Sequence, residues 1–263
     1  MPVPTKYFFL LGGYDLEMVE IRKLLKQRGY AVGVDFADLR LAWNEAQLSR
    51  YAKVFHPSRI NVGIELAEDI PPPPNYHRVD HHNEFANKPS SLEQVAALIG
   101  VELNRKQRLA AVNDRLYIPG LIAAGATGKE INDIRRRDRK AQGATKRDEV
   151  LAQTSIDQHL TQVPGATLVK ALTPHFSAIS DRLFGLFPLP WIIYSDTELV
   201  FYGPGSDRLA AHFADWIRAG KAYAGGGPSG YFGLAENAFT PQEIHTLPDR
   251  ILHFLAQSTT THE

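Results

Sequence analysis

Residues 6–17 read KYFFLLGGYDLE and combine an apolar run, a glycine pair and two acidic residues. The run over 6–11 predicts a buried strand, because apolar and aromatic residues follow one another without a helical period. Gly12 and Gly13 end the run and predict a tight turn. Apolar residues over 16–28 then take helical spacing. A strand, a turn and a helix in this order predict a parallel α/β unit.

Similar patterns extend this unit along the chain. Strands are predicted at 30–36, 60–66, 76–79, 166–172, 191–195 and 199–202, and helices at 43–55, 91–99, 105–116, 128–142, 178–184 and 208–219. The alternation predicts an α/β fold with a parallel sheet in the N-terminal part. Because the composition changes after Gly143, we expect a larger domain at 1–145, a linker at 146–159 and a smaller α/β domain at 160–263, with the active-site cleft between the domains.

Composition limits the possible chemistry. The chain has 263 residues, of which 44% are hydrophobic, so it can bury a sizeable core. Lys plus Arg and Asp plus Glu both number 29, which gives no overall positive field for a long nucleic acid. Cysteine is absent, so any metal ligands must be histidines and carboxylates. No apolar run is long enough for a membrane helix, and we expect a cytoplasmic protein without a membrane partner.

Asp80, His81 and His82 directly follow the predicted strand 76–79. Open α/β sheets place their sites beyond the carboxyl ends of the strands, and one carboxylate with two imidazoles can bind a metal there. A pair of histidines also occurs in ordinary loops, so the triplet alone leaves both interpretations open.

Further acidic residues fall where the same site would need them. Asp15 and Glu17 follow the first predicted strand, Glu65 lies near the end of the third, and Asp114 lies on the predicted helix 105–116. The pair Asp15 and Glu17 also fits a simpler role as capping residues of the following helix. A shared site explains all four acids together.

These motifs occur in the order of the DHH phosphoesterase superfamily. The chain resembles that family in GGYDLE (12–17), VDHHN (79–83) and AVND (111–114), with an acid at a strand end between the first two. AGGGPSGYFG (224–233) is similar to the GGGH loop of the DHH-associated substrate-binding domain. The resemblance therefore implies a DHH-type catalytic domain at 1–145 and a substrate-binding domain at 160–263.

The resemblance also implies a metal site and its reaction. One or two divalent ions, usually manganese, would activate water for attack on phosphorus. The implied metal-binding residues are Asp15, Glu17, Glu65, Asp80, His81 and Asp114, and the implied catalytic residues are Asp80 and His82. Glu17, Glu65, His81 and Asp114 suffice for one site.

Three positions depart from the family pattern. Leu11 stands where the first motif has a histidine, which removes a ligand of one ion site. Glu17 and Glu65 replace aspartates but remain hard oxygen ligands. Pro228 replaces the histidine of the GGGH loop, which bears on substrate choice.

Two segments are candidates for phosphate binding. Arg136 and Arg139 lie about one turn apart on a predicted helix, although the aspartates among the arginines there are equally typical of a solvated helix face. The other candidate consists of the glycines that permit a close backbone approach to a phosphate, namely Gly225, Gly226, Gly227 and Gly230.

The predicted function is metal-dependent hydrolysis of a small phosphorylated substrate, such as a nucleotide, a cyclic dinucleotide or a very short oligonucleotide. The alternative is a degenerate DHH protein that binds a nucleotide or phosphorylated metabolite without hydrolysing it. Other phosphate chemistry on the same fold also stays open. No long nucleic acid is expected as a partner, and a homodimer is compatible with the sequence.

Overall fold

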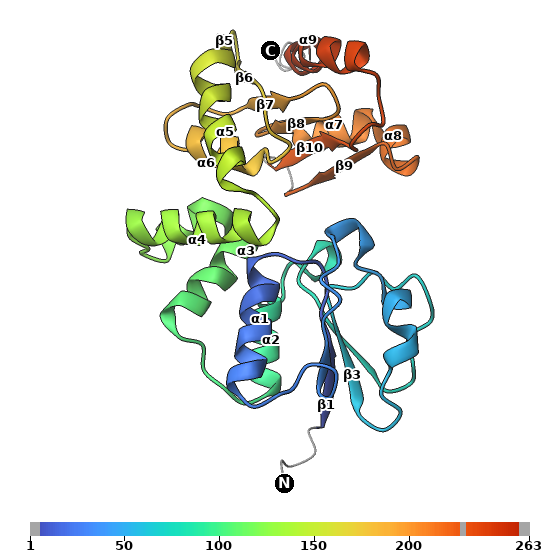
Figure 1. The fold of residues 1–263 in the computed structure, drawn as a ribbon. Coiled ribbons are helices and arrows are strands. Elements are labelled where there is room, and N and C mark those ends of the chain that lie inside the picture. The colour runs from blue at the N-terminus through green and yellow to red at the C-terminus, as the bar shows by residue number, and fades with distance from the viewer. Residues whose placement is uncertain (1–5, 227–229, 258–263) are drawn as a thin grey trace. The chain divides into compact units, whose positions relative to one another are not determined.

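The computed structural model describes residues 6–226 and 230–257, and the chain divides into two compact units between Gly143 and Ala144 (Figure 1). The N-terminal unit contains β1 (Tyr7–Leu10), α1 (Leu16–Gln27), β2 (Phe36–Ala37), the 3-10 helices η1 (Trp43–Glu45) and η2 (Leu48–Val54), β3 (Ile60–Ile64), β4 (Tyr76–Val79), η3 (Asn83–Phe85), α2 (Ser91–Leu98), α3 (Arg105–Ala123) and α4 (Gly128–Ala141). Its strands form a parallel sheet in the order β2-β1-β3-β4. The α/β prediction is therefore confirmed.

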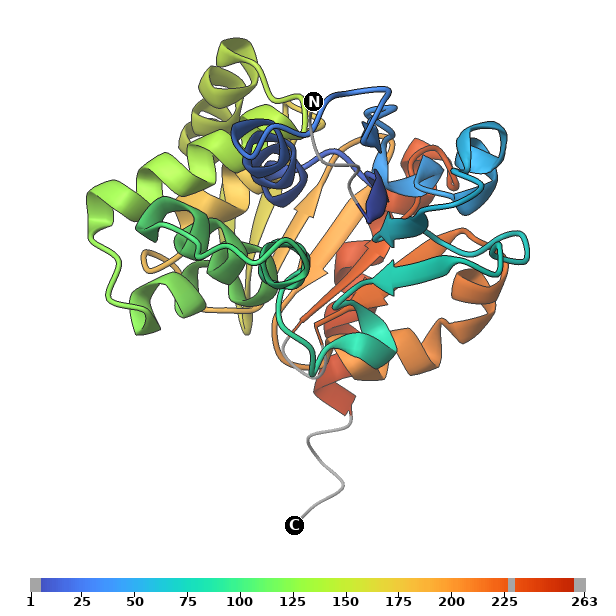
Figure 2. The ribbon, with the colours of Figure 1, turned by 90° about the horizontal axis from the view of Figure 1, so that it is seen from below.

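Strand β1 is buried on both faces of this sheet. Phe9 and Leu11 pack with side chains of α1 and α2, whereas Phe8 and Leu10 pack on the opposite face with residues of the 41–51 segment. Figure 2 shows the helices on one side of the sheet and the segment with η1 and η2 on the other. Burial on both faces explains why the strand is a continuous apolar run rather than an alternating one.

Two predicted elements of this unit differ in the structure. The predicted strand 30–36 is reduced to β2, because the side chain of Asp35 accepts the amide of Ala31 and closes a turn that includes Gly33 at φ 78°. The predicted helix 43–55 is two 3-10 helices. Between them the backbone amide of Leu48 bonds to the carbonyl of Ala67 at 2.8 Å, and this tertiary pairing interrupts the helix.

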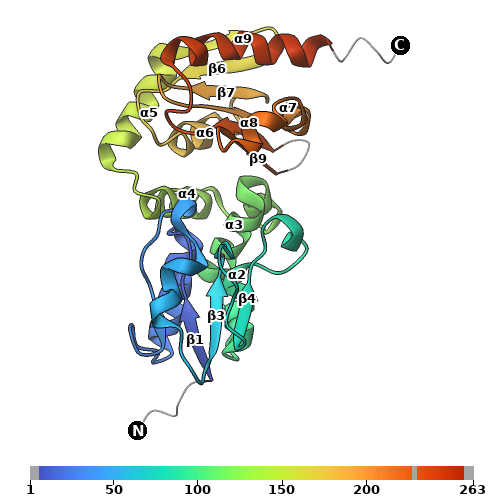
Figure 3. The ribbon, with the colours of Figure 1, turned by 90° about the vertical axis from the view of Figure 1, so that its right-hand side faces the viewer.

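The C-terminal unit contains α5 (Lys146–His159), β5 (Leu160–Val163), β6 (Ala166–Lys170), α6 (Ser177–Leu183), β7 (Trp191–Tyr194), β8 (Leu199–Tyr202), α7 (Ser206–His212), α8 (Ala214–Arg218), β9 (Ala222–Gly225), β10 (Tyr231–Leu234) and α9 (Pro241–Gln257). These strands form a mixed sheet in the order β5-β6-β7-β8-β10-β9. One face packs on α5 and α6, the other on α7, α8 and α9. Figure 3 shows α9 beside β6 and β7.

The segment 146–159, predicted as a linker, is helix α5 of the second unit. Thr145 and Asp148 form a capping box at its start, and Ala152 is fully buried against the sheet. The strands β9 and β10 and the helix α9 were not predicted. Among the described residues, no helix is both long and apolar enough to cross a membrane.

Candidate metal centre

Carboxylates and imidazoles gather at the carboxyl ends of β1, β3 and β4. Asp15 is the N-cap of α1, and its side chain accepts the amide of Met18 at 2.8 Å. The capping interpretation therefore holds for Asp15. Asp15 is also buried, and the charges of Asp114 and Glu65 lie close enough to affect its pKa. Glu17 lies in the first turn of the same helix and accepts the amide of Leu92 through Oε1 at 3.0 Å. Its other oxygen is left to face the site.

Nε2 of His81 lies at the centre of the cluster. It is 2.6 Å from Asp114 Oδ2, 3.3 Å from Glu17 Oε2 and 3.3 Å from Glu65 Oε1. Ligand atoms of Glu65, His81, His82 and Asp114 all lie within 4.8 Å of one another. The ends of β3 and β4 and the interior of α3 thus bring these four candidate ligands to one point, and the start of α1 adds Glu17.

Glu65 is held in a strained backbone conformation at the end of β3. Its φ of 51° is in the left-handed region, which costs a residue with a side chain about 1–3 kcal/mol. The amide of Glu65 bonds to the carbonyl of Val79 at 2.9 Å, so β4 fixes this turn. Gly12 passes so close that an added Cβ would lie 2.3 Å from the carbonyl oxygen of Ile64 and 2.7 Å from that of Glu65. Glycine at position 12 therefore lets the backbone of Glu65 lie against the end of β1.

Helix α4 braces the elements that carry Glu17 and Asp114. Arg135 donates to Asn113 at 2.9 Å and to Asp138 at 2.7 Å, and Asp138 accepts the amide of Leu16 at 3.3 Å. The Arg135 guanidinium also lies 4.4 Å from the ring centroid of Tyr117, where a φ of 54° kinks α3. This buried network ties the neighbours of two candidate ligands together, as supporting hydrogen bonds do in metal sites.

Burial and mutual repulsion shift the titration of the acids. Burial raises the pKa of Glu65 to about 8 and that of Asp114 to about 6. The pKa of Asp15 rises well above its ordinary value because of burial and the charges of Asp114 and Glu65. Burial disfavours a charged His81, but the nearby carboxylates of Asp114, Glu17 and Glu65 outweigh it and raise its pKa to about 12. The cluster favours a positive charge at its centre.

The donor set fits a divalent cation. Buried oxygens of Glu17, Glu65 and Asp114, together with Nε2 of His81, have no hydrogen bond of good geometry within the described residues. Buried polar atoms without partners are rare in proteins and mark sites where an ion or water is needed. Three carboxylates and one imidazole suit manganese, zinc or iron better than calcium or magnesium, which prefer oxygen ligands alone.

His82 belongs to this cluster, whereas Asp80 lies beside it and holds His82. Asp80 Oδ1 accepts the amide of His82 at 2.9 Å and lies 3.1 Å from Nδ1 of the same residue. This contact orients the imidazole and leaves Nε2 as its available nitrogen. The structure therefore places Asp80 as an orienting residue of His82, and not among the atoms that surround His81 Nε2.

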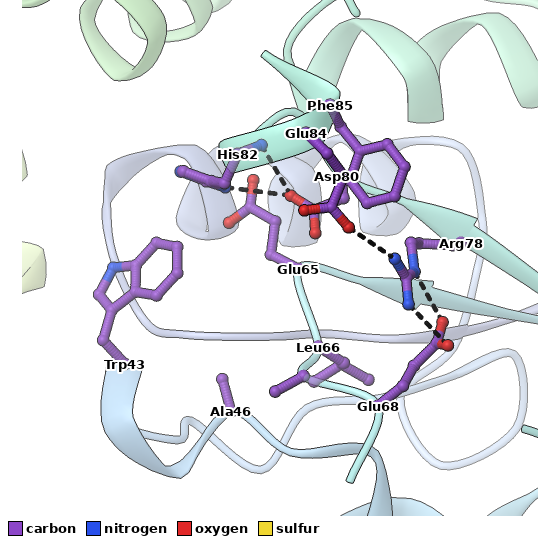
Figure 4. Close-up of a pocket in the computed structure, with 11 residues that line it drawn as sticks. Trp43, Ala46, Glu65, Leu66, Glu68, Arg78, Asp80, His82, Glu84 and Phe85 are labelled. Atoms are coloured by element: carbon purple, nitrogen blue, oxygen red, sulfur yellow. Dashed lines mark hydrogen bonds and ion pairs between the residues drawn. The ribbon is translucent and has the colours of Figure 1, made fainter. Parts of the chain in front are cut away.

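A cavity of about 340 Å³ opens next to His82 (Figure 4). It is lined by Trp43, Ala46, Glu65, Leu66, Ala67, Glu68, Arg78, Asp80, His82, Glu84 and Phe85. Sequence reasoning missed Trp43, Arg78 and Phe85. The local signal for them was weak: Trp43 is an aromatic residue in the same N-terminal region as the motifs. Tertiary packing, and no sequence motif, brings η1 to the cavity.

Other predicted residues have structural partners or lie elsewhere. Leu11 is 1% exposed and packs in the core, and its apolar side chain supplies no metal ligand. Arg136 is exposed and pairs with Asp133 at 2.7 Å, as the solvated-helix interpretation expects. Arg139 is buried, with 7% exposure.

Three glycines of the C-terminal motif, Gly225, Gly226 and Gly230, lie at the facing ends of β9 and β10. An added Cβ at Gly225 would lie 2.5 Å from the hydroxyl of Tyr231, and one at Gly230 would lie 1.9 Å from the carbonyl oxygen of Gly225. Gly226 has a φ of 75°. Close packing at these strand ends thus requires these glycines whether or not they bind a phosphate. Gly227 and Pro228 lie outside the described residues.

Comparisons with known proteins bear on the fold. No protein-family model and no curated protein matches the sequence. RecJ from Thermus thermophilus, solved in complex with Mn²⁺, is similar at a TM-score of 0.50 and 11% identity over 95% of this chain and 52% of RecJ. PggH, a pGpG-specific phosphodiesterase from Vibrio cholerae, is similar at a TM-score of 0.47 and 12% identity, over 95% of this chain and 99% of that protein.

A third solved structure, the DHH domain of a protein described as belonging to a family of ribosomal proteins, is similar at a TM-score of 0.48 and 11% identity, over 93% of this chain and 86% of that protein. RecJ carries the DHH fold, and the match to it spans nearly all of this chain. The resemblance predicted from the motifs is therefore confirmed for the fold.

Proposed function

We propose that this chain, which has the DHH fold, is a metal-dependent phosphoesterase that acts on a small phosphorylated substrate. One observation carries the proposal. Oxygens of Glu17, Glu65 and Asp114 converge on Nε2 of His81 while lacking hydrogen-bond partners of good geometry within the described residues. Such an arrangement costs free energy unless a cation binds there.

In this proposal Glu17, Glu65, His81 and Asp114 hold one divalent ion, with manganese as the first candidate. The ion would supply a water of lowered pKa and charge stabilisation for the phosphoryl oxygens. His82, oriented by Asp80, would donate a proton to the leaving oxygen or bond to the phosphoryl group through Nε2. Asp15 stays beside the ion as the cap of α1.

The substrates proposed are a nucleotide, a cyclic dinucleotide or a very short oligonucleotide. Equal numbers of acidic and basic residues favour a compact substrate over a long nucleic acid. Arg136, Arg139 and the glycines at 225–227 and 230 remain proposed phosphate contacts. A cytoplasmic location and the absence of a membrane partner also remain proposals.

The first experiment is elemental analysis of the purified protein, combined with phosphorus product analysis on mononucleotides, cyclic dinucleotides and dinucleotides in added manganese. Near-stoichiometric metal with turnover supports the proposal. Protein that holds no transition metal, even after incubation with manganese, contradicts it.

A binding protein without hydrolysis is the second candidate, and Leu11 favours it. Leu11 is apolar and buried in the core, so this chain offers one donor fewer for a second ion than the family pattern does. Two ions that clamp the attacking and leaving oxygens are a common device for phosphoryl transfer. Bound metal and bound nucleotide with no product from any of the substrates would identify this second function.

Metal binding should stabilise the fold more strongly as the pH rises. In the metal-free protein Glu65, with a pKa raised by burial to about 8, contributes stability that is present below its ordinary pKa of about 4.5 and is lost as the pH rises through about 8. A bound cation compensates the ionised carboxylates. We therefore expect the difference in Tm between manganese-loaded and EDTA-treated protein to be larger at pH 8.5 than at pH 5.5. If the difference in Tm were the same at pH 5.5 and pH 8.5, the assignment of Glu65 as a metal ligand would be contradicted.

A further inference from the structure

Trp43 presents an exposed aromatic surface beside the candidate metal centre. Trp43 is 47% exposed, although burial of an indole is normally favourable. The indole packs against Gly13, where an added Cβ would lie 3.1 Å from Trp43 Cδ2. The ring also meets His82 edge to face, with centroids 5.0 Å apart. Two contacts thus fix the indole next to the histidine that would act on a phosphate.

The cavity beside Trp43 joins this surface to the phosphate-binding position. Glu65 and His82 belong both to the metal centre and to the cavity lining. Figure 4 shows Trp43 on one side of this space, with Arg78 and Glu68 on the other. Its volume of about 340 Å³ lies within the usual range of about 300–1,000 Å³ for small-molecule pockets. A group attached to a phosphate at the metal would enter this cavity.

The charges of the cavity select against additional phosphates. Four carboxylates line it, those of Glu65, Glu68, Asp80 and Glu84, against the guanidinium of Arg78. Arg78 bonds to both oxygens of Glu68 at 2.6 Å, so its charge is already compensated. The lining therefore carries more negative than positive charge, and this repels a second phosphate in the cavity. The carboxylate oxygens instead suit a group with N–H donors.

The aromatic residues distinguish a flat base from an ammonium group. Phe85 is covered by two cations, with the Arg78 guanidinium 4.9 Å and the Lys88 ammonium 4.2 Å from its ring centroid. Trp43 is therefore the aromatic face of the lining that is open to a ligand, and one open face does not make the aromatic cage that binds quaternary ammonium groups. Stacking of a nucleobase needs one open face only.

We propose that the cavity binds the nucleobase of the substrate, stacked on Trp43, while the phosphate attached to the same nucleoside lies at the metal centre. The proposal rests on the proposed function and narrows the substrate to a nucleotide with one phosphate on this side. Trp43 is accordingly a specificity-determining residue that contacts substrate.

The test is equilibrium binding of 2-aminopurine ribonucleoside 5′-monophosphate to the manganese-loaded protein, followed by quenching of the probe's fluorescence. Trp43→Ala should weaken binding about tenfold or more, and Trp43→Phe should retain most of the affinity. Val54→Ala is the matched control, because Val54 is 44% exposed and lies outside the cavity lining. Its affinity should equal that of the unchanged protein. Thermal unfolding verifies that each variant is folded.

Ribose 5-phosphate lacks a base and should not depend on residue 43. Its inhibition constant against the probe should therefore be the same in the Trp43→Phe variant and in the Val54→Ala control. No binding of the probe, or equal affinity in Trp43→Ala and the control, overturns the base subsite. These results are separate from hydrolysis, which is scored by phosphorus products and metal content. A protein that turns over dinucleotides without any effect of Trp43 would keep the function and lose this subsite.

Discussion

Replacement of His81 by alanine is expected to abolish metal retention and to lower hydrolysis by at least about 100-fold. Even outer contacts of metal ligands typically change affinity by about 10–100-fold, and His81 lies at the centre of the site. Its loss leaves Glu17, Glu65 and Asp114 facing one another without their imidazole, so repulsion among them increases. Elemental analysis after dialysis and product formation in manganese measure the two effects.

His77→Ala is the matched control for this variant. His77 lies on β4, four positions earlier in the chain, and is exposed. It should retain metal and activity. The double change of Asp80 and His81 to alanine should behave like His81→Ala while the fold is preserved. Metal content and turnover that stay at the unchanged level in His81→Ala would refute the assignment of the metal centre.

Replacement of Gly12 by alanine is expected to destabilise the N-terminal unit by about 3 kcal/mol and to weaken metal binding. An added methyl group would meet the carbonyl oxygens of Ile64 and Glu65 at 2.3 and 2.7 Å, and backbone atoms cannot move aside as a flexible side chain does. Overpacking of this kind costs about 1–3 kcal/mol or more. Separation of β1 from the end of β3 would also displace Glu65.

Urea unfolding in EDTA measures the structural part of this effect, and manganese titration of the folded variant measures the displacement of Glu65. Gly128→Ala is the matched control, because Gly128 begins α4 and an added Cβ there meets nothing within 4 Å. It should be neutral or slightly stabilising. Equal stability of the Gly12 and Gly128 variants would show that the two strand ends have room to separate.

Several elements were predictable because their signals are local. The apolar run before Gly12 predicted β1, and helical spacing after it predicted α1. Strand β4, which ends at Val79, was also placed correctly. The carboxyl ends of parallel strands share one edge of a sheet, so this much predicted that the acids and histidines of the motifs would lie near one another.

Most errors arose where contacts distant in sequence decide the conformation, and one arose from a local signal. Pairing of Leu48 with Ala67 turned a predicted helix into two 3-10 helices. The segment 146–159 was taken as a linker, although its capping box at Thr145 and Asp148 is a local helix signal that was overlooked. Arg135 and Asp138 lie on α4, where the charged residues were interpreted as a possible solvated face. In the structure they bond to α1 and α3, and these contacts depend on tertiary packing.

The sequence by itself determined the α/β class and the donor types available to a metal, because strand periodicity and side-chain chemistry are properties of short segments. Only the tertiary structure decided that Nε2 of His81 lies among three carboxylates, each with an oxygen that has no hydrogen-bond partner among the described residues, and that Trp43 lies against His82. The left-handed backbone of Glu65 and the loss of hydrogen bonds on burial are consequences of packing between distant segments. No local pattern records them, since each depends on where another part of the chain excludes water.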